Sequence, residues 1–282
     1  MKTSKIQDFS YHTHTVFSDG KNSIEEMLEK AVDVGYSEIG ISDHLIVNEY
    51  FRENKVFHKN PLYQEHYMYR YDFVSAREKV REHISNIRAV AKNYPIKVWV
   101  GFEVDYFSYE GWEEKFRNLI QGLDIDYMII GNHYCFDEDK NVLLDAAAIS
   151  DYSEDEAVQK KVISWFFKNY KKAIKSGLFD FTAHLTYISR SGVCSTEAYE
   201  QEFVALLELI KKQNMAIELN TAKSDVLEFF SPNRFLLEKA RDLDIPVVIS
   251  DDCHNKNLMT IGYNIAEPYL SELAYLNRWK MK

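Results

Sequence analysis

Imidazole, carboxylate and amide side chains recur at the ends of short apolar runs in this 282-residue sequence. The positions are His12, His14, Asp43, His44, Glu103, His133, His184, Glu218, Asn220, Asp252 and His254. These run ends make up about 20 residues. If the nine histidines were placed at random, about 0.6 of them would fall there on average. Six of the nine fall there. Chance placement does not explain this pattern, which predicts one shared site.

The spacing of these residues favours metal binding. Side chains alternate along an extended strand, so His12 and His14 point to the same face and form a two-ligand chelate. The Asp-Cys-His run at 252–254 repeats this geometry with a carboxylate, and Cys253 should point away. Glu103 closes the apolar run VWVGFE, where a cation would remove the cost of burying an unpaired carboxylate. Imidazoles and carboxylates without a thiolate quartet favour catalytic Zn, Mn or Fe.

Three histidines lie away from the expected strand ends. His83 falls in a charged helix, whereas His58 and His66 fall in an irregular, aromatic-rich insertion near 47–71. We expect none of the three to bind metal, and we interpret them as solvated or substrate-facing residues. The insertion is too long for a tight connection between a strand and a helix, and it could form a lid.

A recurring order of apolar run, polar turn and helical segment positions the site residues. The expected strands span 8–12, 38–42, 97–102, 127–131, 179–183, 216–219 and 247–250. The expected helices span 22–35, 72–93, 110–121, 154–176, 197–213 and 232–243. Ser23 and Glu26 predict a capping box for the first helix. Ser231 and Pro232 predict the N-cap and the first residue of the last helix.

Seven such units predict an α/β fold in which a parallel sheet closes into a barrel. The carboxyl ends of all strands in such a barrel converge on one face, so His12 and His254 would surround one cavity. No linker rich in Pro, Gly or Ser interrupts the chain, and we expect a single domain over 1–282.

The composition restricts the partners and the compartment. Lys and Arg number 34 against 44 Asp and Glu, and a net charge of −10 without an evident basic stripe argues against nucleic acid or membrane partners. No apolar stretch approaches the roughly 20 residues that span a bilayer, and the amino terminus lacks the apolar region of a signal peptide. The three cysteines, Cys135, Cys194 and Cys253, are far apart and suit reduced thiols. We therefore expect a cytoplasmic protein.

Seven ordered motifs along the chain resemble one family. They are HTHTVFSDG at 12–20, SDH at 42–44, GFEVDY at 101–106, GNH at 131–133, AH at 183–184, ELNTA at 218–222 and SDDCH at 250–254. Together they resemble the polymerase and histidinol phosphatase (PHP) superfamily over nearly the whole chain. The chain length, GFEVDY and ELNTA look most like the monofunctional histidinol-phosphate phosphatases.

The resemblance implies a distorted seven-stranded (β/α)7 barrel, similar to a TIM barrel, with two to three divalent ions (Zn, Mn or Fe) at its carboxyl face. The implied ligands are His12, His14, Glu103 and Asp252 for the first ion, Glu103, His133 and His184 for the second, and Asp19, His44 and His254 for the third. Many members carry a histidine eight residues after the first of the His-x-His pair, whereas Gly20 stands there in this chain. The alternative role for Asp19 and Gly20 is an ordinary turn.

The implied activity is that of a phosphoric monoester hydrolase. The expected reaction converts L-histidinol phosphate to L-histidinol and phosphate in histidine biosynthesis, by attack of a hydroxide that bridges two ions. The catalytic residues would be Glu103, Asp252 and His254. The proton for the leaving oxygen could come from Asp252, His254 or a metal-bound water.

The expected substrate is a small phosphorylated metabolite. Arg190 and Lys223 follow strand ends and are the expected phosphate-binding residues, with Arg234 as a further candidate. Glu218 and the aromatic insertion could receive an imidazole and an amine, although the same aromatics could simply pack the barrel mouth.

Two other functions stay open. A PHP phosphoesterase could act on another phosphomonoester, or on a phosphodiester or nucleic acid end, although the negative net charge argues against nucleic acid. A metal-retaining binding module without turnover would be expected only if the ligand set were broken. Here every main ligand position is filled.

Overall fold

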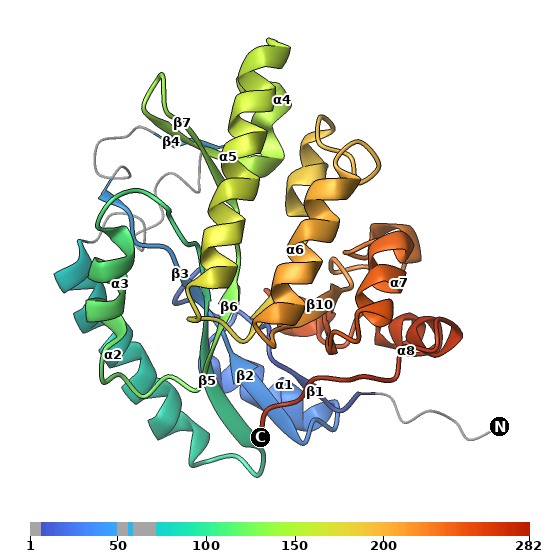
Figure 1. The fold of residues 1–282 in the computed structure, drawn as a ribbon. Coiled ribbons are helices and arrows are strands. Elements are labelled where there is room, and N and C mark those ends of the chain that lie inside the picture. Colours follow the sequence, from blue (N-terminus) through green and yellow to red (C-terminus); the bar gives the residue numbers. More distant parts are fainter. Residues whose placement is uncertain (1–6, 50–55, 59–71) are drawn as a thin grey trace.

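Seven parallel strands form the centre of the protein (Figure 1). The computed structural model describes residues 7–49, 56–58 and 72–282. Along the sheet the strands are β1 (Phe9–Ser10), β2 (Glu38–Ile41), β5 (Lys97–Val104), β6 (Tyr127–Ile130), β9 (Phe181–Thr182), β10 (Ala216–Asn220) and β11 (Val247–Ser250). A parallel bridge between Thr13 and Cys253 joins the segments that follow the first and last strands. The sheet is a nearly closed barrel, and the predicted (β/α)7 fold is confirmed.

Helices cover the outside of the barrel (Figure 1). They are α1 (Ile24–Asp33), α2 (Phe73–Ala91), α3 (Trp112–Ile120), α4 (Ile149–Tyr152), α5 (Glu156–Lys175), α6 (Glu200–Lys212), α7 (Arg234–Asp242) and α8 (Tyr263–Glu272). The six helices expected from the sequence are confirmed to within a few residues, whereas α4 and α8 were not expected. Among the described residues, no helix combines the length and the apolar character needed to cross a bilayer.

The start of α1 follows directly from its sequence. Ser23 Oγ accepts a hydrogen bond from the Glu26 N–H at 3.3 Å, and Glu26 Oε2 accepts one from the Ser23 N–H at 3.1 Å. These two bonds satisfy backbone donors that a helix start otherwise leaves free. The predicted capping box is confirmed.

The predicted start of α7 at Ser231 and Pro232 is wrong. The N-cap is Asn233, whose Oδ1 accepts a hydrogen bond from the Leu236 N–H at 3.2 Å. Ser231 instead exchanges backbone hydrogen bonds with Asn220, at 2.8 and 2.9 Å. Because its backbone is held beside the end of β10, the helix begins later than the sequence indicates.

A second, smaller sheet was not expected from the sequence. The hairpin of β7 (Tyr134–Asp137) and β8 (Val142–Asp145) pairs with β4 (Val56–Phe57). A further short strand, β3 (His44–Leu45), pairs with the end of β5. Of the insertion that we interpret as a lid, 50–55 and 59–71, including His66, lie outside the described residues.

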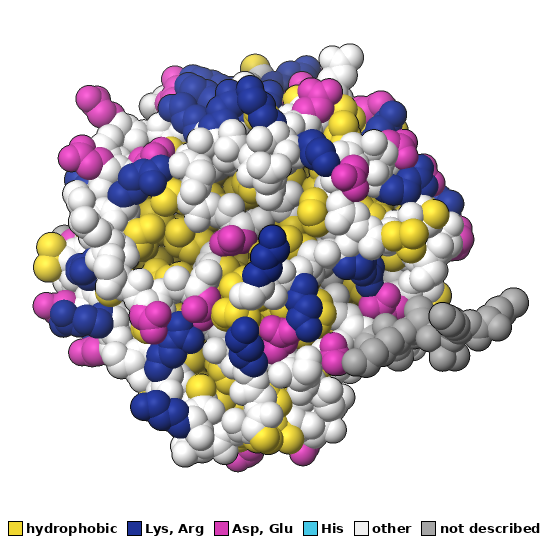
Figure 2. Space-filling model, turned by 60° about the horizontal axis from the view of Figure 1, so that its bottom comes forward, with side chains coloured by type: hydrophobic (Ala, Val, Ile, Leu, Met, Phe, Trp, Pro, Cys, Tyr) yellow, Lys and Arg dark blue, Asp and Glu magenta, His cyan; other side chains and the backbone are white. Residues whose placement is uncertain are grey.

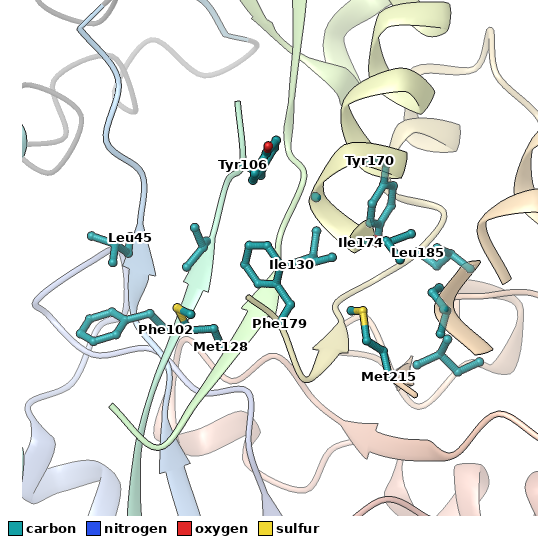
Figure 3. Close-up of a cluster of buried hydrophobic side chains, with 14 of the residues drawn as sticks. Leu45, Phe102, Tyr106, Met128, Ile130, Tyr170, Ile174, Phe179, Leu185 and Met215 are labelled. Atoms are coloured by element: carbon teal, nitrogen blue, oxygen red, sulfur yellow. The ribbon is translucent and has the colours of Figure 1, made fainter. Parts of the chain in front are cut away.

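Alternation along the strands separates the apolar core from the barrel interior. Figure 3 shows Phe102, Met128 and Ile130, from β5 and β6, among core side chains that include Tyr170 of α5. Neighbouring side chains of a strand point to opposite faces. Glu103, the residue after Phe102, therefore points into the barrel.

Aromatic side chains fill the barrel below this level. A Cβ atom on Gly101 would lie 2.2 Å from Cζ of Tyr127, so only glycine leaves room for that ring. The Tyr127 hydroxyl donates to the carbonyl of Tyr11 at 2.6 Å. Trp279, near the carboxyl terminus, packs against Tyr11 and Phe181 at ring-centroid distances of 5.5 and 5.1 Å. These rings separate the carboxyl end of the barrel interior from Glu38 at the start of β2, whose carboxylate accepts a hydrogen bond from the Trp99 indole at 2.5 Å.

One helix corrects our interpretation of the surface charge. The sequence of α5 contains six lysines and one glutamate, and no arginine. The lysines lie at positions 160, 161, 168, 171, 172 and 175. With 3.6 residues per turn, all six fall within about 120° of the helix circumference. The conclusion that the chain has no basic stripe is wrong, because apolar residues separate these lysines in the sequence but not on the helix surface.

Candidate metal centre

All nine expected ligand residues lie together at the carboxyl ends of the barrel strands. They are His12 and His14 after β1, Asp19 in the following turn, His44 in β3, Glu103 in β5, His133 after β6, His184 after β9, and Asp252 and His254 after β11. The most exposed of these side chains, that of His254, is only 16% exposed. The barrel therefore brings distant parts of the sequence into one buried cluster.

Glu103 lies at the centre of this cluster and is 1% exposed. Its Oε2 atom lies 3.1 Å from His12 Nε2 and 3.1 Å from His44 Nδ1. Its Oε1 atom lies 2.9 Å from His184 Nε2 and 3.3 Å from His133 Nε2. Each carboxylate oxygen thus faces at least two imidazoles, and Oε2 also lies 3.5 Å from His14 Nε2. This is the arrangement that a bridging ligand requires.

Two further carboxylates extend the cluster toward the outside. Asp252 Oδ1 lies 3.2 Å from both His14 Nε2 and His254 Nδ1. Asp19 Oδ1 lies 3.0 Å from His254 Nε2 and 3.5 Å from His44 Nε2. Asp19 therefore faces the cluster, although the chain lacks the histidine that many family members carry at the next position.

Within the described residues, four groups bring their ligand atoms to within 4.8 Å of one another. They are His14, Asp19, His44 and His254; His12, His14 and Glu103; His12, His184 and Asp252; and His44, Glu103 and His133. The expected third set lies within the first group. His44 and His184 also join groups outside their expected sets, so the possible ligand sets overlap more than the resemblance implies.

Several ligand atoms are buried and have no hydrogen-bond partner among the residues that the structure describes. They are His12 Nε2, His14 Nε2, Asp19 Oδ1, His44 Nδ1, Glu103 Oε1 and Asp252 Oδ1. Leaving a buried polar group unsatisfied costs about 1–3 kcal/mol. Imidazole nitrogens and carboxylate oxygens that face one another would avoid this cost by sharing divalent cations. The donor set thus fits Zn, Mn or Fe.

The charges in the cluster shift the pKa values of its members. Burial alone would raise the pKa of Glu103, but the neighbouring histidines, His12 foremost, hold it well below its usual range. Burial alone would lower the pKa of His12, but Glu218 and the other carboxylates raise it well above its usual value. The carboxylates thus create a site that attracts positive charge.

Two buried carboxylates orient the histidines from behind. Glu218 Oε1 lies 2.6 Å from His12 Nδ1, and Asp105 Oδ2 lies 2.8 Å from His133 Nδ1. Such contacts fix the tautomer and the orientation of a metal-binding imidazole. The expectation that Glu218 receives the substrate is wrong, because its side chain is fully buried against His12. Asp105 was not predicted from the sequence, although its spacing of two residues from Glu103 could have indicated that both side chains point to the same face.

Asp43, another strand-end residue, supports the turn that carries Asp19. Its carboxylate accepts hydrogen bonds from the N–H and the hydroxyl of Thr15, at 2.7 and 2.8 Å, and from the Ser18 hydroxyl at 2.6 Å. His83 Nε2 of α2 lies 2.9 Å from the same carboxylate. The expectation that His83 faces solvent or substrate is wrong, because its side chain is buried against Asp43. Among the described residues, no metal-binding group contains it.

A pocket opens onto the cluster, and both expected phosphate-binding residues, Arg190 and Lys223, line it. Lys223 Nζ lies 3.6 Å from Asp252 Oδ2. His58 also lines the pocket, so this histidine lies near the cluster without belonging to a ligand group.

The prediction that Arg234 is a further phosphate-binding residue is wrong. Its guanidinium lies 2.8 Å from Glu238 Oε1 and 2.8 Å from Glu272 Oε1, and it does not line the pocket. Contacts between α7 and α8 hold this side chain away from the barrel mouth.

Two solved structures share the fold. A Listeria monocytogenes protein assigned as a histidinol phosphatase is 20% identical, with a TM-score of 0.68 over 91% of this chain and 99% of that chain. Histidinol phosphate phosphatase from Lactococcus lactis, solved with Zn, L-histidinol and phosphate, is 15% identical, with a TM-score of 0.67 over 99% of this chain and 98% of that chain. At these identities the likeness establishes the fold.

The sequence matches one curated relative and one family model. DNA polymerase/3′-5′ exonuclease PolX of Bacillus subtilis is 25% identical over 255 residues, which are 88% of this chain and 34% of that protein. The chain thus spans about a third of the length of this relative. The model of the PHP domain matches residues 10–222, well over half of the chain. The chain therefore belongs to the PHP domain family.

Proposed function

We propose that this chain is a metal-dependent phosphomonoesterase that hydrolyses L-histidinol phosphate to L-histidinol and phosphate. The observation that carries the proposal is the convergence of imidazoles and carboxylates around Glu103, with Arg190 and Lys223 lining the same pocket. A metal cluster beside fixed cations suits a phosphate dianion, although the chain as a whole is acidic. The L. lactis complex with Zn, L-histidinol and phosphate supports this substrate.

The proposal includes two to three ions of Zn, Mn or Fe, with Glu103 between two of them. The residues that would hold them are His12, His14, Asp19, His44, Glu103, His133, His184, Asp252 and His254. Bound divalent ions would polarise the phosphoryl oxygens and lower the pKa of a bound water. We further propose that residues 1–282 form a single domain and that the protein lies in the cytoplasm. Its three buried thiols would stay reduced there.

Residues at the pocket wall would bind and orient the substrate. Lys223 Nζ lies 3.6 Å from Asp252 Oδ2 at the edge of the cluster, which supports a contact between its ammonium group and a phosphate oxygen. The guanidinium of Arg190 lies 5.0 Å from the ring of Tyr187, a contact that limits its freedom beside the pocket. Asp252 and His254 line the same pocket, and either could deliver the proton to the leaving oxygen.

The test is phosphate release by the metal-loaded protein, with metal analysis of the same samples. The substrates are L-histidinol phosphate, a panel of sugar and nucleotide monophosphates, and bis-p-nitrophenyl phosphate. Selective turnover of L-histidinol phosphate would support the proposal. Preference for another monoester would replace the substrate but keep the chemistry, and no turnover of any compound would favour a binding module.

A second candidate function is hydrolysis of a phosphodiester or of a nucleic acid end. The similarity to PolX over 88% of this chain favours it, although that protein is about three times longer. Cleavage of bis-p-nitrophenyl phosphate in preference to all monoesters would support this candidate.

A further inference from the structure

A basic groove lies on the outside of the barrel, apart from the metal cluster. It runs between α5 and α6, which pack side by side (Figure 1). Its lining includes Lys160, Lys168, Lys171, Lys172 and Lys175 from α5, and Tyr199 and Glu202 near the start of α6. We call this the lysine groove. On the face drawn in Figure 2, basic side chains mostly lie singly among acidic ones, but several gather at the upper edge.

Four of the five groove lysines form no ion pair with a described residue, although Glu202 also lines the groove. Lys160 Nζ lies 3.2 Å from the exposed carboxylate of Glu156, and Lys172 Nζ donates to the carbonyl of Ser108 at 3.1 Å. The other three groove lysines have no ion pair or hydrogen bond within the described part of the chain. A chain with a net charge of −10 thus concentrates like charges on one helix, where they repel one another.

We propose that the lysine groove binds single-stranded nucleic acid through its phosphate backbone. From Lys160 to Lys175 the stripe extends about 22 Å at 1.5 Å per residue, long enough to follow several successive phosphates. All of its cations are lysines. Lysine binds phosphates as a point charge and needs no fixed fork geometry. The composition of the groove therefore suits the successive phosphates of a flexible strand.

The shape of the groove selects a single strand. The axes of two packed helices typically lie about 8–10 Å apart, so a groove between them is too narrow to enclose a double helix. Tyr199 supplies a half-buried aromatic ring at the wall, stacked on Phe167 with ring centroids 5.8 Å apart. Basic grooves with aromatic side chains are the usual means of binding single strands without sequence preference.

The test measures binding of a fluorescent single-stranded oligothymidine, about 12 nucleotides long, by anisotropy. If about four phosphates are contacted, the logarithm of the affinity should fall with the logarithm of salt concentration with a slope of about −3. Replacing the three unpartnered lysines (Lys168→Ala, Lys171→Ala, Lys175→Ala) should weaken binding at about 50 mM salt at least tenfold and reduce the slope by about 2.

A matched control removes the same charge elsewhere, through Lys30→Ala in α1, Lys92→Ala at the C-cap of α2 and Lys239→Ala in α7. Its affinity should stay within about threefold of the original, because the control leaves the local field of the groove intact. Turnover of L-histidinol phosphate should be unchanged in both triple variants, so the binding result is separate from the proposed function.

Four outcomes would overturn the proposal. They are no binding of the oligonucleotide at about 50 mM salt, equal binding by the groove variant and the unaltered protein, equal competition by polyglutamate, and binding of anionic lipid vesicles but not of the oligonucleotide. Weaker binding by the groove variant alone, with competition by other single strands, is the supporting result.

Discussion

The carboxylate of Glu103 faces imidazoles from four separate segments of the chain, those of His12, His44, His133 and His184. Its burial would be costly without positive charge, and the histidines alone supply that charge only when they are protonated. A divalent cation on each oxygen would satisfy the same requirement with neutral imidazoles. The electrostatics of this one side chain thus link the fold to the proposed chemistry.

Glu103→Gln tests this link, because glutamine keeps the shape and removes the charge. We expect the loss of at least one ion per chain, measured by inductively coupled plasma mass spectrometry. Phosphatase activity should fall by more than the about 10–100-fold typical of residues that only orient a ligand. Glu114→Gln, on the exposed side of α3, should retain both properties. An unaltered metal content in Glu103→Gln would refute the bridging role.

Arg190→Ala should separate substrate binding from metal binding. Losing a charge-assisted contact of about 1.5–3 kcal/mol should raise KM by about 10–100-fold, whereas the ions should stay in place because the guanidinium belongs to no ligand group. Steady-state kinetics with metal analysis on the same preparation provide the measurement. Arg234→Ala is the control, since that side chain pairs with Glu238 and Glu272 away from the pocket. Normal kinetics of Arg190→Ala would remove this residue from the site.

Helix α2 supports the turn between β1 and α1 through His83, whose Nε2 lies 2.9 Å from the buried carboxylate of Asp43, a residue between β2 and β3. The same carboxylate holds Thr15 and Ser18, so the position of Asp19 depends on a helix that contributes no candidate ligand itself. The ring of His83 also stacks on Phe17, with centroids 3.7 Å apart. The outer part of the cluster is therefore supported by an element outside the barrel strands.

His83→Phe should keep the stacking on Phe17 and remove the contact with Asp43. Leaving a buried carboxylate short of one partner should lower the free energy of unfolding by about 1–3 kcal/mol, measured by urea denaturation. During dialysis, the variant should also lose one ion faster than the unaltered protein does, because Asp19 lies at the outer edge of the cluster. His83→Asn should partly restore stability and metal retention, because its side-chain amide can donate a hydrogen bond to Asp43. If His83→Phe has unaltered stability and metal content, Asp43 does not need this partner.

The elements that the sequence predicted correctly are those with a regular local pattern. The Ser23–Glu26 capping box and the apolar stripe that follows it are contained within one helix, so α1 could be predicted alone. The start of α7 depends on whether Ser231 or Asn233 caps the helix. Both residues are suitable N-caps, and the pairing of Ser231 with Asn220 decides between them. The role of Asp43 likewise depends on tertiary contacts that spacing does not encode.

Across the whole molecule, the candidate ligands tie β3, β5 and the segments after β1, β6, β9 and β11 to one point. The sequence predicted this convergence because all strands of a parallel barrel end on the same face. It did not predict the lysine groove, because the charge total conceals how lysines gather on one helix. Residues that share a barrel end can thus be found from strand order, whereas surface patches require the helical geometry as well.

Because the cluster joins the strands only in the folded state, metal removal should destabilise the entire barrel. Ions present at about 100 times their Kd would add about 2.7 kcal/mol to the free energy of unfolding. At about 2–4 °C per kcal/mol, chelation should lower Tm by about 5–10 °C, measured by calorimetry before and after treatment. Re-addition of Zn or Mn should restore Tm, and Glu103→Gln should show a smaller shift. An equal Tm for the metal-loaded and the demonstrably metal-free protein would mean that the cluster is fully formed by its own hydrogen bonds, contrary to the unsatisfied buried atoms around Glu103.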